Sequence, residues 1–113
     1  METNKLNPDF YTYRVTWSQE DEEFVATCAE FPSLSWLEPS QEAALTGIRS
    51  LAAEVIRDLV ESGEPVPEPL SLKAYSGNFM VRSTPFIHRK LATEAAEAGV
   101  SLNRLVNSKL MGG

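Results

Sequence analysis

The chain has 113 residues, of which 42% are hydrophobic, and a formal net charge of −6. This length suits one ordinary domain or two very small ones, and the composition is typical of a globular rather than a disordered protein. No apolar run approaches the roughly 18 residues of a membrane span, and the N-terminus lacks the hydrophobic core of a signal peptide. The one cysteine, Cys28, cannot form an internal disulfide. We therefore expect a cytoplasmic protein with no membrane partner.

Charge is divided unevenly along the chain. Residues 1–70 carry four basic and 14 acidic side chains, a net charge of −10, whereas residues 71–113 carry six basic and two acidic ones, a net charge of +4. A split of this kind indicates two modules with different partners. The acidic part would repel nucleic acid and attract a basic protein, and the basic part could approach a phosphate backbone.

Three strands are predicted in the first module. Residues 10–17, FYTYRVTW, alternate between apolar and polar, which is typical of a strand with one buried face. That face would hold four side chains: Tyr11, Tyr13, Val15 and Trp17. Residues 23–31, EFVATCAEF, follow a polar turn and predict the second strand of an antiparallel hairpin. A short third strand is expected around Leu34–Leu37.

A long helix is predicted over residues 41–62. Ser40 is well placed as its N-cap, and Gly63 ends it at the C′ position. Five apolar residues recur at helical spacing and mark its buried stripe: Leu45, Ile48, Ala52, Val55 and Leu59. The prolines of residues 64–70 make the next segment extended, and a last strand is expected near Leu70–Lys73. The first module is therefore predicted as a β-β-β-α-β arrangement.

Two short helices are predicted in the second module. Thr84 caps the first helix, and Pro85 is tolerated as its first residue. Gly99 ends this helix, and Ser101 caps the next one. The apolar positions of the two helices follow helical spacing: Ile87, Leu91, Ala95 and Ala98 in the first, and Leu102, Leu105, Val106 and Leu110 in the second.

A short strand is predicted before these helices, at residues 78–82, in which Phe79 and Val81 point away from the three other side chains. The module has only about 36 residues, too few to bury enough apolar surface alone. A single strand also has two unpaired edges. Pairing of two copies would solve both problems, because antiparallel strands would form a ribbon with Phe79 and Val81 against interlocked helices. We therefore expect a homodimer or a higher oligomer.

The outer face of this ribbon carries candidate DNA-binding residues. A two-stranded ribbon fits the major groove, where Arg82 can grip guanine and Asn78 can pair with adenine. The backbone N–H groups at the start of the second helix, at Ser101, can hold a phosphate, and Asn103 could add a side-chain contact. The candidate site residues are Asn78, Met80, Arg82, Ser101 and Asn103.

Residues 78–110, NFMVRSTPFIHRKLATEAAEAGVSLNRLVNSKL, resemble the ribbon-helix-helix repressors, in the version found at the C-terminus of HicB-family antitoxins. The alternating strand and the turn GVSLNRLVN carry this resemblance. It implies that Asn78, Met80 and Arg82 read bases, and that Ser101 and the start of its helix clamp a phosphate. Met80 departs from the pattern, in which a polar residue is commoner; it could contact a thymine methyl or contribute little to specificity.

The first module resembles the same family. A hairpin followed by AEFPSLSWLEPSQEAALTGIRSLAAEVIRDLVESGEPVPEP is similar to the HicB N-terminal domain, a partial ribonuclease-H-like fold, with Ser33 where glycine is usual. The resemblance implies an α+β protein with a toxin-binding domain at residues 1–74 and a ribbon-helix-helix domain at residues 75–113. The implied function is that of a type II antitoxin. It would neutralise a small basic HicA-type toxin that cleaves mRNA and repress its own operon by binding operator DNA.

Three alternatives stay open from the residues themselves. Residues 78–113 could serve dimerisation alone, although that role does not require Arg82 on the outer face. A stand-alone ribbon-helix-helix regulator without a toxin partner would have the same two domains. A nuclease would need carboxylates that converge on Mg²⁺ ions, and residues 10–17 contain none. We therefore expect no enzyme activity, no cofactor and no metal site.

The surface that would bind a basic partner has no motif to mark it. Charge complementarity favours the exposed sheet edge and the acidic surface of the first module, with Glu20–Glu23 and Glu30 as candidates. The same module could also join two dimers into a tetramer.

Overall fold

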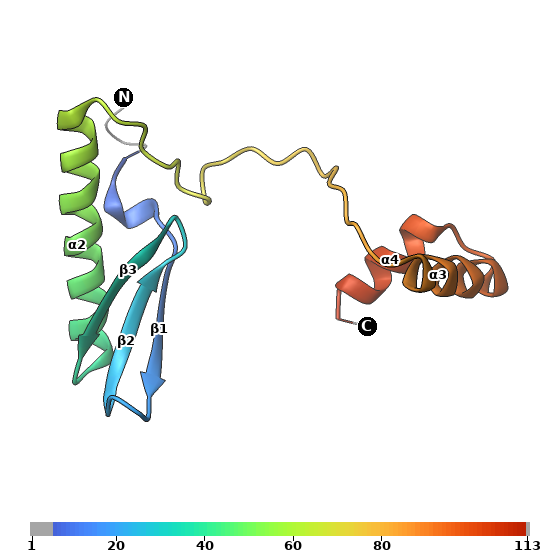
Figure 1. Cartoon of the computed structure of the whole chain (residues 1–113), viewed down its shortest axis with the longest axis horizontal. Coiled ribbons are helices and arrows are strands. Elements are labelled where there is room, and N and C mark those ends of the chain that lie inside the picture. Colours follow the sequence, from blue (N-terminus) through green and yellow to red (C-terminus); the bar gives the residue numbers. More distant parts are fainter. Residues whose placement is uncertain (1–5, 113) are drawn as a thin grey trace. The chain divides into compact units, whose positions relative to one another are not determined.

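The computed structural model describes residues 6–112. They form an α+β protein with one three-stranded antiparallel sheet and three α-helices (Figure 1). They fall into two compact units that divide between Tyr75 and Ser76. The first unit holds the sheet and the longest helix, and the second holds the two shorter helices.

The sheet of the first unit has three strands in the order β1-β2-β3: β1 (Tyr13–Ser18), β2 (Glu23–Cys28) and β3 (Phe31–Glu38). Both neighbouring pairs are antiparallel, so the predicted hairpin is confirmed, with Ser18 opposite Glu23 at its closed end. The register between β2 and β3 shifts at residues 27–28, where Cys28 comes to lie opposite Phe31.

The strand bounds differ from the predicted ones. A 3₁₀ helix, η1 (Pro8–Phe10), occupies the residues before the expected start of β1, because Pro8 suits a first helical position and Asn7 caps it. β1 therefore begins at Tyr13 rather than Phe10. β2 ends earlier than predicted because residues 29–30 form the turn into β3. β3 is longer and includes Pro32, which an edge strand tolerates.

The buried face predicted for residues 10–17 is confirmed at three of its four positions. Tyr11 is buried, and Tyr13 and Val15 pack partly buried against the core. Trp17 is 50% exposed, contrary to the prediction. It lies at the hairpin end of an edge strand, where its ring meets that of Phe24 edge to face, with centroids 5.0 Å apart.

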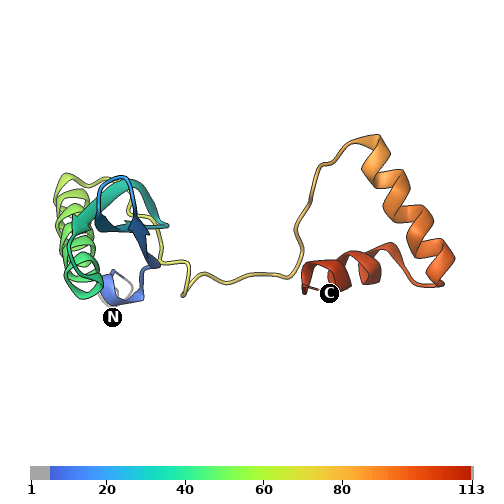
Figure 2. The ribbon, with the colours of Figure 1, turned by 90° about the horizontal axis from the view of Figure 1, so that it is seen from below.

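The helix α2 (Gln41–Ser62) has the predicted bounds and caps. Ser40 Oγ accepts a hydrogen bond from Ala43 N at 3.1 Å, and Gly63 ends the helix with a φ of 72°. The helix lies along one face of the sheet (Figure 2). Its buried residues are spaced four apart: Ala44, Ile48, Ala52 and Ile56.

This stripe is shifted from the predicted one at its start. Leu45, predicted to be buried, is 43% exposed, whereas its neighbour Ala44 is fully buried. A small residue at position 44 lets the helix approach the sheet closely, so the larger leucine is left on the flank. Val55 and Leu59 pack partly buried against the core, as part of the predicted stripe.

The core of the first unit lies between α2 and the sheet. Its buried members are Tyr11, Ala26, Cys28, Phe31, Ala44, Ile48 and Ile56. Tyr11 stacks on Phe31 with ring centroids 5.5 Å apart. Burial raises the pKa of the Cys28 thiol, which fits an unreactive core residue.

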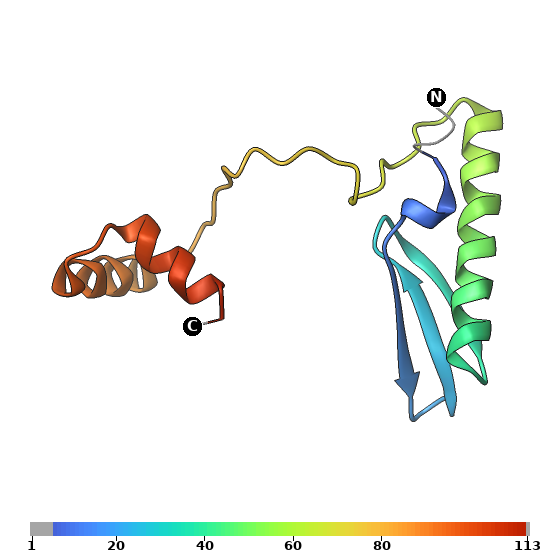
Figure 3. The same ribbon diagram turned by 180° about the vertical axis from the view of Figure 1, so that it is seen from behind.

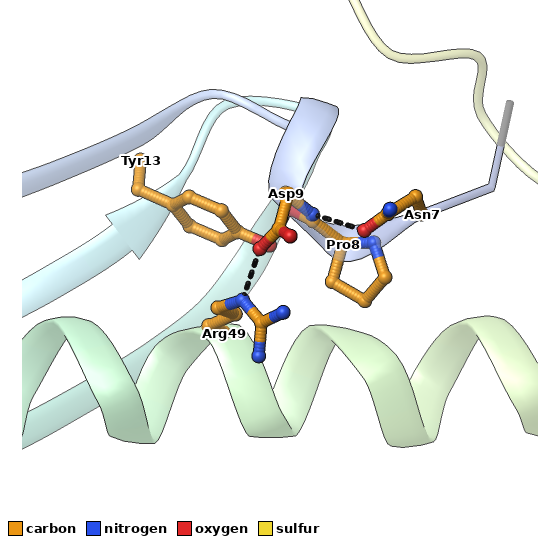
Figure 4. A network of polar contacts seen from close by, with 5 residues as sticks. All are labelled: Asn7, Pro8, Asp9, Tyr13 and Arg49. Atoms are coloured by element: carbon orange, nitrogen blue, oxygen red, sulfur yellow. Dashed lines mark hydrogen bonds and ion pairs between the residues drawn. The ribbon is translucent and has the colours of Figure 1, made fainter. Parts of the chain in front are cut away.

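A polar network fixes η1 to β1 and α2 (Figure 4). Arg49 of α2 donates a hydrogen bond to Asp9 and forms an ion pair with it. Tyr13 Oη donates to the Pro8 carbonyl at 2.6 Å. The hydrogen bond from Arg49 lowers the pKa of Asp9, and burial raises the pKa of Tyr13 to about 12.

The fourth strand predicted near Leu70–Lys73 is not formed. Leu72 and Lys73 instead donate their backbone N–H groups to the carbonyls of the residues three positions earlier, which makes a turn. The preceding segment cannot pair as a strand, because prolines at positions 65, 67 and 69 remove every second N–H donor. The first unit is therefore β-β-β-α rather than β-β-β-α-β.

Side chains hold this proline-rich segment where strand pairing does not. Tyr11 Oη donates to the Pro67 carbonyl at 2.7 Å, and Ser71 Oγ donates to the Phe10 carbonyl at 2.6 Å. These bonds tie the chain after α2 to the start of the sheet.

The second unit is a helical hairpin of α3 (Pro85–Ala98) and α4 (Leu102–Leu110) (Figure 3). The predicted caps at Thr84 and Ser101 are confirmed, since each hydroxyl accepts a hydrogen bond from the N–H three residues on, at 3.2 and 3.1 Å. Gly99 ends α3 with a φ of 68°.

Candidate nucleic-acid interface

Residues 78–84 lead into α3 without a pairing partner, so the strand predicted at residues 78–82 is not formed in the single chain. A strand needs the N–H and C=O groups of a neighbour, and the described residues of one chain offer none here. Gly77 begins the segment with a φ of 88°, a conformation that suits glycine. Ser76 Oγ accepts a hydrogen bond from Asn78 N at 3.0 Å and fixes this turn.

Apolar side chains of this segment and of both helices line one groove. They are Phe79, Val81, Ile87, Leu91, Leu102, Val106 and Leu110. Phe79 is 74% exposed and Val81 is 70% exposed. Within the described range of the second unit, Ala95 is the one buried apolar residue. A single copy of this unit therefore leaves its apolar face uncovered; we call it the apolar groove.

The residues predicted to face DNA differ in their surroundings. Asn78 and Asn103 line the same hollow between the extended segment and α4. Arg82 lies at the apolar groove instead. Met80 is 82% exposed. The structure of one chain thus brings Asn78 and Asn103 together in one hollow. Met80 and Arg82 lie outside this hollow and are accessible.

Ser101 organises the start of α4. Its hydroxyl accepts the N–H of Arg104, so this oxygen caps the helix. The N–H groups of residues 102 and 103 have no acceptor within the helix, because the first turn of any α-helix leaves them unpaired. A phosphate held here would contact those two N–H groups and the side chain of Asn103, and the Ser101 hydroxyl keeps its own proton to donate to it.

Two neighbouring residues were not singled out by the sequence. Asn107 lines the hollow of Asn78, and its Nδ2 donates to the Asn103 carbonyl at 2.9 Å. Arg104 lies in the first turn of α4, where the helix dipole disfavours a cation. The position of Arg104 was therefore a signal in the sequence for an anion-binding site, since a basic residue in the first turn of a helix suggests an anion nearby.

Basic side chains dominate the described part of the second unit, with five of them against two glutamates. Lys109 of α4 pairs with Glu94 of α3 at 3.0 Å. Both partners are about half exposed, at 50% and 44%, so the pair contributes little to stability. The remaining cations are available to an anionic partner.

Glu30 of the first unit is engaged internally and does not form a free acidic surface. Its carboxylate accepts hydrogen bonds from Thr12 N and Thr12 Oγ1, both at 3.0 Å, and from Leu70 N at 2.9 Å. Burial acts to raise the pKa of Glu30, but hydrogen bonds from the backbone of Leu70 and Thr12 outweigh it, and the pKa is lowered. Of the suggested partner contacts, Glu20, Asp21 and Glu22 are exposed, and Glu23 is half-buried.

Residues 6–112 contain no group of three or more His, Cys, Asp or Glu side chains placed to hold a metal ion. Among their helices, none combines the length and the apolar character that crossing a membrane requires.

The chain is similar to the HicB family. The family's model matches residues 62–110, from the last residue of α2 to the last residue of α4. The matched range contains all five candidate DNA-binding residues, whereas the sheet and nearly all of α2 lie outside it. No curated protein and no solved structure matches the chain.

Proposed function

We propose that this protein is an antitoxin of the HicB type. It neutralises a small basic HicA-type toxin that cleaves mRNA, and it represses its own operon in the cytoplasm. The match of residues 62–110 to the HicB family, which is known as a family of antitoxins, supports this proposal. The second unit binds operator DNA as a homodimer or a higher oligomer, and the first unit binds the toxin.

The uncovered apolar groove is the observation that carries the DNA-binding role. Phe79 and Val81 are mostly exposed in one copy, and the segment that holds them has no strand partner. A second copy supplies both missing elements at once, because two antiparallel segments pair as a ribbon and the groove closes over their apolar side chains. Asn78, Met80 and Arg82 then lie on the outer face of the ribbon, which fits the major groove.

The start of α4 supports a phosphate contact beside this ribbon. Ser101 caps the helix, and the unpaired N–H groups of its first turn attract an anion. Asn103 and Arg104 lie in the same turn. Phosphate contacts there would fix the register of the protein on DNA, while the ribbon residues read the bases.

The role of the first unit rests on charge and on the family. Residues 1–70 carry a net charge of −10, which favours a basic protein over nucleic acid as the partner. β1 carries no carboxylate, so we propose binding rather than nuclease activity, with no cofactor.

A stand-alone ribbon-helix-helix regulator without a toxin is the second candidate. The family match is compatible with this candidate, because it covers most of the second unit but only residues 62–75 of the first. Co-purification with the product of the small reading frame beside this gene separates the two functions, since the antitoxin binds it and the stand-alone regulator does not.

The DNA-binding role is tested with a fragment of the protein's own promoter. Replacement Arg82→Ala should weaken specific binding by about 10- to 100-fold, as expected for the loss of a contact to guanine. Arg89→Ala removes the same charge from α3 and is the matched control, with a smaller effect expected. Wild-type binding should also weaken steeply with salt, because bound phosphates release counterions. Equal binding by the Arg82→Ala variant would contradict the ribbon assignment.

A further inference from the structure

A second groove lies in the first unit, between the end of β3 and the first turns of α2. Trp36 forms one wall, and small residues of the helix form the floor: Ala43, Gly47 and Ser50. Glu38 and Glu42 lie at its mouth. We call it the Trp36 groove, and nothing in DNA recognition uses it.

Gly47 explains why the indole lies where it does. A Cβ atom at position 47 would come within 2.0 Å of Trp36 Nε1, so only glycine permits this contact. Glycine inside a helix costs about 1 kcal/mol relative to alanine. The indole therefore lies directly on the helix backbone, and its Nε1–H donates to Glu38 Oε2 at 2.7 Å, which fixes its orientation. Even so, Trp36 remains 37% exposed.

The carboxylates around this groove are not neutralised. Among the described residues, neither Glu38 nor Glu42 forms an ion pair. The acidic hairpin Glu20–Glu23 lies at the same end of the unit, because Phe24 pairs with Glu38 in the sheet (Figure 1). Arg49, the neighbour of Ser50 on α2, is already bound to Asp9. An exposed indole thus lies at an acidic end of the unit.

We propose that the Trp36 groove is the place at which the first unit binds its basic protein partner. A lysine or arginine side chain of that partner lies on the Trp36 indole and pairs with Glu38 and Glu42. This inference rests on the proposed function, and it adds the docking surface and the chemistry that recognises the partner.

Two other occupants fit the groove less well. A nucleic acid would bring phosphates against six carboxylates at this end: Glu20, Asp21, Glu22, Glu23, Glu38 and Glu42. A second copy docked through the same face would bring two acidic ends together, which like-charge repulsion opposes. The small side chains of Ala43 and Ser50, by contrast, allow the backbone of a partner segment to come close while its basic side chain reaches the indole.

The test uses the full chain and, as the probe, the purified product of the small reading frame beside its gene. The double variant Glu38→Gln/Glu42→Gln keeps the size of both side chains, and glutamine still offers an acceptor to the indole. We expect its affinity for the probe to fall at least about tenfold, with a weaker salt dependence. Glu54→Gln/Asp58→Gln removes the same charge from exposed positions later in α2 and should change the affinity less than about twofold.

A spectroscopic readout reports on the groove itself. Trp17→Phe leaves Trp36 as the one tryptophan of the chain. Its fluorescence should shift to shorter wavelength when the probe binds, because a docked segment excludes water from the indole. Trp36→Phe leaves Trp17 as the reporter and should show a smaller shift.

The outcomes separate the inference from the proposed function. If wild-type protein does not bind the probe, the antitoxin function fails and this inference fails with it. If wild-type and the Glu38→Gln/Glu42→Gln variant bind the probe equally, the function stands and the groove assignment is overturned. If the double variant changes the oligomeric mass of the protein in the absence of the probe, the groove is an interface between copies, and the inference is again overturned.

Discussion

The two units of this chain have equally regular helices but very different interiors. In the first unit, α2 lies on a three-stranded sheet and the pair buries seven residues in one core. In the second, side chains cap the N-termini of both α3 and α4, yet only Ala95 is buried within the described range. The unit that we propose to read DNA is thus the one that a single copy leaves incomplete.

This contrast separates local order from tertiary stability. Caps such as Ser40 and Ser101 act within one turn of helix and need no other element. Burial requires a second layer of structure. The sheet provides that layer for α2, whereas the apolar faces of α3 and α4 stay exposed. We therefore expect oligomerisation and DNA binding to be coupled in the second unit, and the stability of the first unit to be independent of both.

The largest effect should come from a charge placed in the apolar groove. Val81→Asp puts a carboxylate where two copies meet, so we expect a monomer without DNA binding, while the first unit stays folded. Analytical ultracentrifugation measures the mass, and circular dichroism follows unfolding of the sheet unit. Met80→Asp is the control, because it should reduce DNA binding and leave the mass unchanged. A Val81→Asp protein with wild-type mass would refute the pairing.

A core substitution in the first unit should have the opposite pattern. Ile48→Ala empties a fully buried site between α2 and the sheet and should cost about 2–5 kcal/mol of unfolding free energy. Urea denaturation followed by tryptophan fluorescence measures it. Leu45→Ala, at an exposed position, should cost less than about 1 kcal/mol. If the Ile48→Ala variant lost self-association under conditions in which its sheet stays folded, the two units would not be independent.

The contact between Gly47 and Trp36 predicts a sign change. Gly47→Ala should destabilise the first unit by about 1–2 kcal/mol, because the strain of displacing the indole exceeds the gain in helix propensity. In a Trp36→Ala background the same change should stabilise it by about 1 kcal/mol. A double-mutant cycle by urea denaturation tests this, and equal effects in both backgrounds would rule the contact out.

The smallest effect concerns pH and Glu30. Hydrogen bonds lower the pKa of Glu30 in the folded state. Its contribution to the free energy of unfolding is therefore present above the unfolded-state pKa near 4.5, and it is lost as pH falls through the folded-state pKa. Glu30→Gln should therefore cost about 1 kcal/mol at pH 7, and the difference from wild type should shrink at acidic pH. Thermal unfolding from pH 3 to 7 measures the difference. A gap that widens at low pH would contradict the assignment.

Local signals predicted local features well. The bounds of α2, the N-caps of all three α-helices and the glycines that end α2 and α3 followed from Ser, Thr, Pro and Gly at the right offsets. The fourth strand failed because the alternating prolines were interpreted as an extended approach to a strand and not as a loss of donors. Leu45 and Trp17 were misplaced because burial depends on where a neighbouring element ends, which periodicity does not contain.

The candidate site was predictable only in part for a related reason. Asn78, Met80, Arg82, Ser101 and Asn103 follow from alternation, capping and resemblance. One chain already orders Ser101 and Asn103 at the start of α4, whereas the ribbon that we propose for residues 78–82 requires a second copy. Gly47 inside a helix was the available sign of the Trp36 groove, although nothing local shows which side chain occupies the space. Glu30 looked like surface charge because its partners, Thr12 and Leu70, are distant in sequence.

Amide hydrogen exchange of residues 78–82 in the full-length protein tests the central claim most directly. If two copies pair this segment as a ribbon, alternate amides should be protected, and the protection should rise with protein concentration. Exchange at the rate of an unstructured peptide, at concentrations where the sheet amides are protected and promoter DNA is bound, would contradict the account.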